Sequence, residues 1–134
     1  MEATVPQAPV AYEARTDLPF DHAVERCREA LAREGFGVLT EIDVKATFKK
    51  KLDVDREPYL ILGACHPPSA YRALTAVPEV GVLLPCTVTV SVEDGKTVVR
   101  AMNPEAAMAV IPHPVLKEVA TEVGAALQRV VAAV

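Results

Sequence analysis

The 134-residue sequence predicts a single domain in which short β-strands alternate with α-helices. Three observations support this prediction. The length is that of one ordinary domain, and no repeat, low-complexity tract or linker divides the chain. Apolar residues at helical spacing alternate along the chain with short strand-like runs. An Asp94-Gly95 turn between two alternating segments predicts a β-hairpin, so part of the sheet is expected to be antiparallel.

The first half of the chain is predicted to contain three strands and two helices. Residues 1–9 are expected to form a loose arm ahead of a domain that spans 10–134. The predicted elements are a strand at 10–15, a helix from Pro19 to Gly35, a strand at 36–43, a helix at 44–52 and a strand at 59–65. The third strand is continuously apolar, which is typical of a central strand buried on both faces.

Two of these elements carry expectations about which side chains face the core. In the second strand, alternation places Phe36, Val38 and Ile42 on one face. In the second helix, Phe48 and Leu52 fall four residues apart, which predicts a short amphipathic helix. Its four lysines are flanked by acidic residues, so we expect a solvated helix face rather than an anion-binding site.

The second half adds a helix, the hairpin and a long final helix. The predicted elements are a helix from Pro67 to Pro78, strands at 87–93 and 96–102, a short turn after Asn103 and a helix that begins at Pro114. With a type I′ turn, Val90 lies opposite Val99 and Val88 opposite Ala101, on the buried face. Gly124 inside the last helix costs about 1 kcal/mol relative to alanine. It therefore suggests the close approach of another element, either the sheet or a second subunit, and we favour the sheet.

Composition and charge restrict the class of function. Fourteen basic and eighteen acidic residues give a net charge of −4, which argues against a nucleic-acid partner because such proteins neutralise phosphates with clustered Lys and Arg. No apolar run approaches the roughly 18 residues that span a membrane. The N-terminus has neither the basic stretch nor the apolar run of a secretory signal. We therefore expect a cytoplasmic protein with no membrane or nucleic-acid partner.

The three cysteines are the first candidates for chemistry. Cys27 falls in the apolar stripe of the first helix and is expected to be structural. Cys86 has the parity of a core residue, although its position directly after Pro85 at a strand entrance leaves exposure of the sulfur open. Cys65 ends a buried strand just before a helix that begins at Pro67, where the helix N-terminus can lower a thiol pKa. Cys65 and Cys86 are therefore the candidate catalytic thiols, with simple packing as the alternative.

A metal site is the weaker interpretation of the same residues. Cys65, His66 and Cys86 are soft ligands that suit zinc or copper(I). The sequence has no Cys-x-x-Cys or His-x-x-x-His pair, however, and His113 lies between two prolines that explain its loop without a metal. No Gly-rich phosphate loop and no Gly-x-Ser-x-Gly motif is present. We therefore predict no metal and no cofactor, and no enzyme class is indicated.

Several separated segments together carry a resemblance to a known family. They are Gly35-Phe36-Gly37-Val38-Leu39 with Glu41-Ile42-Asp43, Tyr59-Leu60-Ile61-Leu62, Gly63-Ala64-Cys65-His66-Pro67, Leu83-Leu84-Pro85-Cys86 and Asn103-Pro104. In this order and spacing, from about Val10 to the C-terminus, the chain resembles the family named domain of unknown function 302. One departure is His66, which stands where we associate the family with Asn, a good helix N-cap. That position then looks structural, which weakens His66 as a metal ligand.

The resemblance implies architecture rather than activity. It implies an α+β two-layer sandwich with a curved, mainly antiparallel sheet and helices on one side, similar in outline to the TATA-box-binding-protein fold. It also implies a homodimer. It implies no substrate or cofactor, and likeness to a DNA-binding fold does not make this acidic chain a DNA-binding protein.

Three hypotheses for function follow. The first is a non-enzymatic homodimeric module that binds a small ligand or a protein partner, supported by the few catalytic groups, the apolar last helix and a mean hydropathy of +0.21. The second is a thiol-based protein that uses Cys65 and Cys86 for redox chemistry, sulfur handling or a soft metal. In the third, both cysteines only pack. We favour the first.

Overall fold

The computed structural model describes residues 9–134, so all of the predicted arm except Pro9 lies outside the described residues. The strands are β1 (Ala11–Thr16), β2 (Gly37–Asp43), β3 (Tyr59–Cys65), β4 (Cys86–Glu93) and β5 (Lys96–Met102). The helices are α1 (Phe20–Arg33), α2 (Val44–Leu52), α3 (Pro67–Ala76), the 3₁₀ helix η1 (Pro78–Leu83), α4 (Pro104–Met108) and α5 (Pro114–Ala132).

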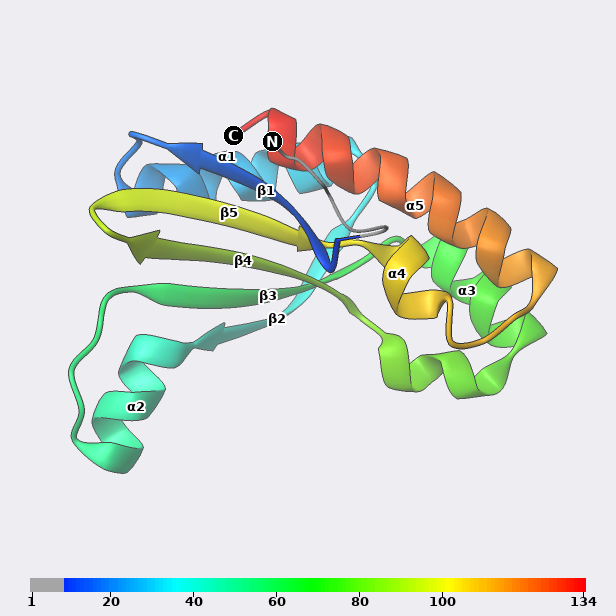
Figure 1. Cartoon of the computed structure of the whole chain (residues 1–134), viewed down its shortest axis with the longest axis horizontal. Coiled ribbons are helices and arrows are strands. Elements are labelled where there is room, and N and C mark those ends of the chain that lie inside the picture. The colour runs from blue at the N-terminus through cyan, green and yellow to red at the C-terminus, as the bar shows by residue number, and fades with distance from the viewer. Residues whose placement is uncertain (1–8) are drawn as a thin grey trace.

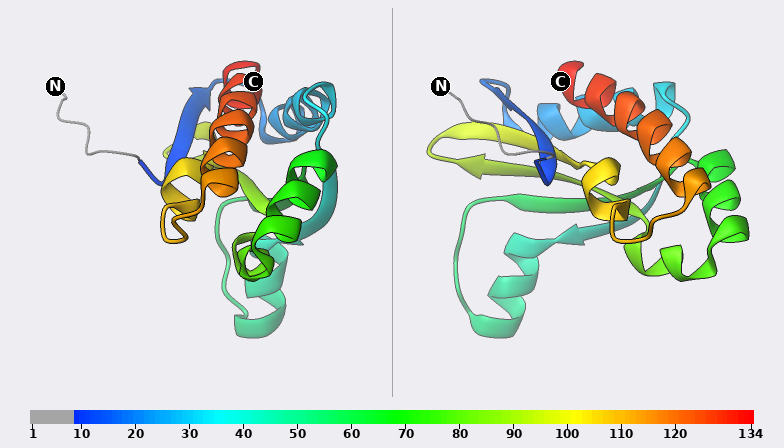
Figure 2. Two further views of the ribbon diagram at one scale, coloured as in Figure 1. Left: turned by 90° about the vertical axis from the view of Figure 1, so that its right-hand side faces the viewer. Right: turned by 45° about the vertical axis from the view of Figure 1, so that its right-hand side comes forward.

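The five strands form one antiparallel sheet in the order β1-β5-β4-β3-β2, so β1 and β2 are its edges. Helices α1 and α5 run across one face of the sheet, with α3 and α4 beside the N-terminal part of α5 (Figure 1, Figure 2). Helix α2 stands apart from them, next to the β2 edge. This is the α+β two-layer arrangement expected from the resemblance. Among residues 9–134, no helix is both long and apolar enough to span a membrane.

The β4–β5 hairpin has the predicted register. Val90 pairs with Val99 and Val88 with Ala101, and all four side chains are buried. Asp94 and Gly95 both have positive φ, at 52° and 79°, as a type I′ turn requires. The right-handed twist of this turn matches that of the flanking strands, which fixes the register locally.

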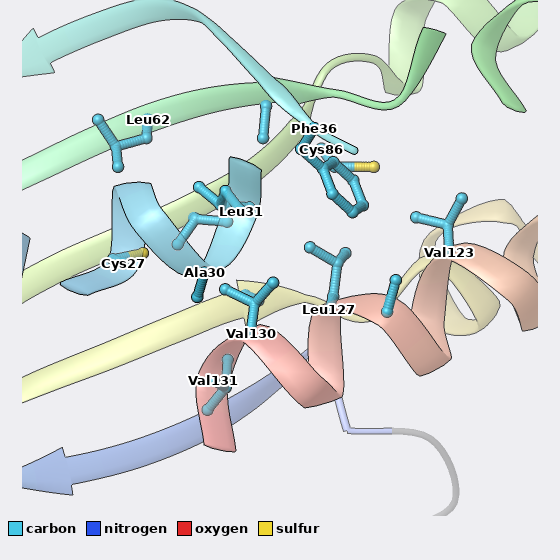
Figure 3. Close-up of a cluster of buried hydrophobic side chains, with 14 of the residues drawn as sticks. Cys27, Ala30, Leu31, Phe36, Leu62, Cys86, Val123, Leu127, Val130 and Val131 are labelled. Carbon is cyan, nitrogen blue, oxygen red and sulfur yellow. The ribbon is translucent and has the colours of Figure 1, made fainter. Parts of the chain in front are cut away.

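Helix α5 supplies the largest part of the core. Nine of its residues are buried, in a stripe that packs on β1, β5, α1, α3 and α4. Leu127 and Val130 of α5 point towards Leu31 of α1 in the core cluster (Figure 3). The apolar spacing seen in the sequence is therefore the face that joins the helical layer to the sheet.

Gly124 marks the point where α5 approaches β1. A Cβ at this position would lie 2.9 Å from Tyr12 Oη and 3.6 Å from Cγ of Pro104. The Tyr12 hydroxyl donates a hydrogen bond of 2.9 Å to Asn103 Oδ1, which holds it against the helix. The sheet is thus the element that approaches Gly124, as we favoured.

Strand β2 departs from the predicted alternation. Its register against β3 shifts between Val38 and Thr40, so Leu39 is the extra residue of a β-bulge. Each side chain after the bulge therefore changes face. Ile42 pairs with Ile61 on the side away from the helices and is 49% exposed. The prediction that Ile42 shares a face with Val38 was wrong, because alternation alone does not reveal a bulge.

Helix α2 has the predicted bounds but does not pack as an amphipathic helix usually does. Asp43 caps its N-terminus, where the carboxylate accepts a 2.9 Å hydrogen bond from the Ala46 N–H. No residue of α2 is buried, and Phe48 and Leu52 are exposed. The apolar stripe exists, but β2 and β3 cover it only in part: Phe48 remains 37% exposed and Leu52 65% exposed.

The approach of Tyr12 to Gly124 predicts a destabilised Gly124→Ala variant. Alanine gains about 1 kcal/mol of helix propensity, whereas overpacking costs about 1–3 kcal/mol. We expect a net loss in the free energy of unfolding, measured by urea denaturation. In a Tyr12→Phe background the loss should shrink, because the hydroxyl oxygen that meets the new Cβ is gone. Equal effects in both backgrounds would contradict this packing argument.

A second prediction concerns acid stability. Arg100 binds Glu93 through both terminal nitrogens at 2.5 and 3.0 Å, and Ser91 Oγ donates to the same carboxylate at 2.7 Å. These bonds, that of Arg100 first, lower the pKa of Glu93 from 4.5 to about 2. Ionised Glu93 therefore stabilises the folded state fully above pH 4.5, and this contribution is lost as the pH falls through about 2. In this pH range, urea denaturation should show a shallower loss of stability for Glu93→Gln than for the wild type.

Candidate functional site

The structure places the three cysteines in two different environments. Cys27 lies in α1 and Cys86 begins β4, and both are buried in the core; the sulfur of Cys86 lies beside the Phe36 ring (Figure 3). Burial raises the pKa of each of these two thiols from 9.0 to about 11. Cys65, the last residue of β3, is half-buried, and all three thiols are free. Only Cys65 therefore combines a free thiol with access to solvent.

Cys65 lies near enough to Cys86 to contribute, after burial as the main cause, to the raised pKa of Cys86, but the two residues are not directly paired across β3 and β4. The β3–β4 register pairs Cys86 with Ala64, not with Cys65. Successive side chains of a strand point to opposite faces, so Cys65 leaves β3 on the side opposite the core in which Cys86 is buried. Within residues 9–134, no group of three or more His, Cys, Asp or Glu side chains is placed to hold a metal ion. Cys65, His66 and Cys86 are thus not gathered into a ligand set.

His66 instead connects the start of α3 to the end of α1. It is the N-cap residue of α3, and its Nδ1 lies 2.8 Å from the hydroxyl oxygen of Ser69, three residues further on. Its ring packs at an angle on Phe36, with ring centroids 5.4 Å apart. A Cβ at Gly35, whose φ is +83°, would lie 3.2 Å from the ring. Gly35 is therefore required both by its backbone conformation and by the space that His66 occupies.

A hollow of about 200 Å³ opens beside this ring, and we call it the His66 hollow. It is lined by Glu34, Phe36, His66, Ser69, Glu122, Val123, Ala126 and Arg129. Its charged groups are paired with other side chains: Arg129 binds Glu34 at 2.9 Å, which lowers the Glu34 pKa, and Arg72 binds Glu122 at 3.2 Å. Sequence reasoning missed this hollow because α1, α3 and α5, which form it, are distant in the chain.

The His66 hollow has little catalytic capacity. A serine nucleophile needs a histidine base that a third group orients. In the described part of the chain, Ser69 is the only hydrogen-bond partner of the His66 ring, and Ser69 is itself buried. The pair joins the side chains of the N-cap residue and of the residue three positions later in the first turn of α3. The arrangement stabilises the start of α3 and leaves no free charge to bind an ionic substrate.

Gly63, which begins the segment Gly63-Ala64-Cys65-His66-Pro67, also has a packing role. A Cβ at Gly63 would collide with Thr40 and would lie 2.9 Å from Cγ of Pro85. The side chains of Thr40 in β2 and of Pro85 just before β4 therefore occupy the space over Gly63. Glycine at this position allows that approach, so it does not by itself indicate a ligand.

The sequence and the fold both match those of a known protein family. The family model described as "Domain of unknown function DUF302" matches residues 12–134. The chain belongs to this family. It is similar to the crystal structure of the uncharacterized conserved protein DUF302 from Bacillus stearothermophilus, with a TM-score of 0.87 and 31% identity. The match covers 93% of this chain and 98% of that chain, while no curated protein matches. DUF302 membership and the predicted fold are thereby confirmed.

Burial predicts a sharp difference in thiol reactivity. In native protein at mildly alkaline pH, iodoacetamide should modify Cys65 alone, because Cys27 and Cys86 are buried and their pKa values are raised to about 11. Peptide mass spectrometry reports the labelled residue, and unfolding in denaturant should expose the other two. Rapid native labelling of Cys86 would contradict this prediction and revive the two-thiol hypothesis.

Proposed function

We propose that this DUF302 protein is a non-enzymatic homodimeric module that binds a small ligand or a partner protein. The observation that carries the dimer is an apolar surface along one edge of the sheet, which we call the β2–α2 surface. It consists of the exposed side chains Leu39, Ile42, Phe48, Leu52 and Val54. Five large hydrophobic residues within 16 positions form a concentrated exposure, and such concentrations mark interaction sites.

The helix in this surface needs a partner for its stability. Isolated helices shorter than about 12–15 residues are marginal in water, and most helical stability in proteins comes from packing of the apolar face. Helix α2 has nine residues, none of them buried. Packing of Phe48 and Leu52 against a second surface would bury the apolar area that the rest of residues 9–134 leaves exposed.

The neighbouring strand supports the same conclusion. Strand β2 is an edge of the sheet, so one side of its backbone has no strand partner. Proteins usually protect such edges with charges, prolines or a covering element. Strand β2 has a β-bulge and the charged residues Glu41 and Asp43, but the bulged residue Leu39 is itself 66% exposed. A covering subunit resolves both the free edge and the exposed leucine.

Charge favours a second copy as the occupant. Helix α2 carries Lys45, Lys50 and Lys51 without ion pairs in the described structure, while Asp55 and Glu57 follow in the next segment. A two-fold axis brings one patch against the same patch on its partner. A surface with both signs of charge can then set its lysines against the partner's carboxylates, which keeps the apolar residues at the centre.

The structure gives less support to the thiol-based alternative. It began from two cysteines, but the burial of Cys86 and the β3–β4 register leave Cys65 alone on its side of the sheet. A lone half-buried thiol with no residue placed to activate it does not define a reaction. The module hypothesis needs no thiol, and it uses a surface on which several large hydrophobic side chains are exposed close together in the sequence.

The dimer predicts a specific effect of charge on the β2–α2 surface. Leu52→Glu should weaken self-association by about a hundredfold or more, because one buried leucine contributes about 1.5–3 kcal/mol and the interface contains two copies. Sedimentation velocity over a range of protein concentrations measures this effect. Val82→Glu is the matched control, since Val82 is 85% exposed in η1 and lies outside the surface. A monomeric wild type, or dissociation caused by Val82→Glu but not Leu52→Glu, would sink the proposal.

A further inference from the structure

We propose that a cavity between α4 and α5, the α4–α5 cavity, binds a small amphipathic carboxylate. It measures about 530 Å³ and is formed by α4, the connector that follows it and the first two turns of α5. Ligand sites in proteins have volumes of roughly 300–1,000 Å³ and mostly apolar walls with a few polar groups. This inference supplies the small ligand of the module proposed above, but it uses none of the residues of the β2–α2 surface.

The walls of the cavity suit an apolar ligand body. Met108, Leu116 and Ala120 are buried and form part of its lining, and Ile111 is half-buried beside them. The connector comprises the five residues 109–113, and Pro112 lies within it, two positions before α5 begins at Pro114. The fixed φ of proline stiffens this rim, so the cavity does not collapse without cost when it is empty.

The polar groups on the α5 side favour a negatively charged ligand head. Lys117 is exposed and has no ion-pair partner within residues 9–134. His113 Nδ1 accepts a 3.1 Å hydrogen bond from the Val115 N–H. The neutral ring therefore carries its hydrogen on Nε2, which makes that nitrogen a donor. The N-terminus of α5 adds partial positive charge on the same side of the cavity.

An acidic residue of α4 determines the orientation that we expect for a bound carboxylate. Glu105 lines the cavity and accepts a 3.2 Å hydrogen bond from Thr121 Oγ1. Its carboxylate therefore lies against α5 at Thr121, one turn beyond Lys117, and disfavours a second negative charge at that end of the cavity. A carboxylate ligand is therefore expected to place its head next to Lys117 and His113, with its chain over Met108 and Leu116.

The α4–α5 cavity and the β2–α2 surface lie in different parts of the molecule. Figure 1 shows α2 at the opposite end of the molecule from α4 and the start of α5. Ligand binding and dimerisation can therefore be tested separately. A monomeric Leu52→Glu variant should bind the ligand as the wild type does, so that failure of the dimer proposal leaves this one standing.

Octanoate and 1-octanol are the probes, since they share a chain and differ in the charged head. Isothermal titration calorimetry should show octanoate binding about tenfold more tightly than octanol to the wild type, because only octanoate pairs with Lys117. Lys117→Met should remove this difference and leave octanol binding unchanged. The matched control Lys96→Met removes a lysine from the β4–β5 hairpin and should change neither affinity.

A second variant tests the apolar part of the site. Ala109 is exposed at the rim, so Ala109→Trp should fill the opening without disturbing the core and should abolish the binding of both probes. Amide chemical shifts on titration with octanoate should change for residues 105–120. The proposal is overturned if octanoate does not bind, if Lys117→Met binds it as tightly as the wild type, or if the shifts cluster elsewhere.

Discussion

The burial of one face of α5 is the interaction on which the rest of this structure depends. Its stripe packs on β1 and β5 and also on α1, α3 and α4, so it joins all the helices except α2 and η1 into one layer. Helix α5 lies so close to β1 that a side chain at position 124 would collide with the Tyr12 hydroxyl. The His66 hollow and the α4–α5 cavity both use α5 as a wall, the first through the C-terminal half of the helix and the second through its first turns. A shift of α5 would therefore alter the core and both hollows together.

The residues that the sequence marks as candidates for a functional site have structural roles in the fold. Gly63 makes room for Thr40 and Pro85, Cys86 is in the core, and His66 is bonded to Ser69 against the Phe36 ring. Each of these roles has a steric or hydrogen-bonding reason that needs no ligand. The structure therefore favours a binding function over covalent chemistry, at surfaces outside the segments 63–67 and 83–86.

A single bulged residue explains much of the exposed surface. Because Leu39 is inserted into β2, every later side chain of that strand changes face, and Ile42 turns away from the helical layer. The chain then enters α2 beyond the sheet edge, where no other helix lies next to it (Figure 2). The apolar stripe of α2 and the free edge of β2 are thus presented together. An apolar face that the rest of residues 9–134 leaves largely exposed is the physical basis of the proposed homodimer.

The sequence alone determined the elements whose signals are local. The Asp94-Gly95 turn set the register of the hairpin, Pro67 and Pro114 marked helix starts, and the spacing along α5 identified its buried face. Only the tertiary structure decided the side on which Ile42 lies, the separation of Cys65 from Cys86 and the existence of the α4–α5 cavity. The reason is that periodicity describes a residue relative to its neighbours in the chain. A bulge, a strand register and a cavity depend on which distant segments meet, and no local pattern encodes that.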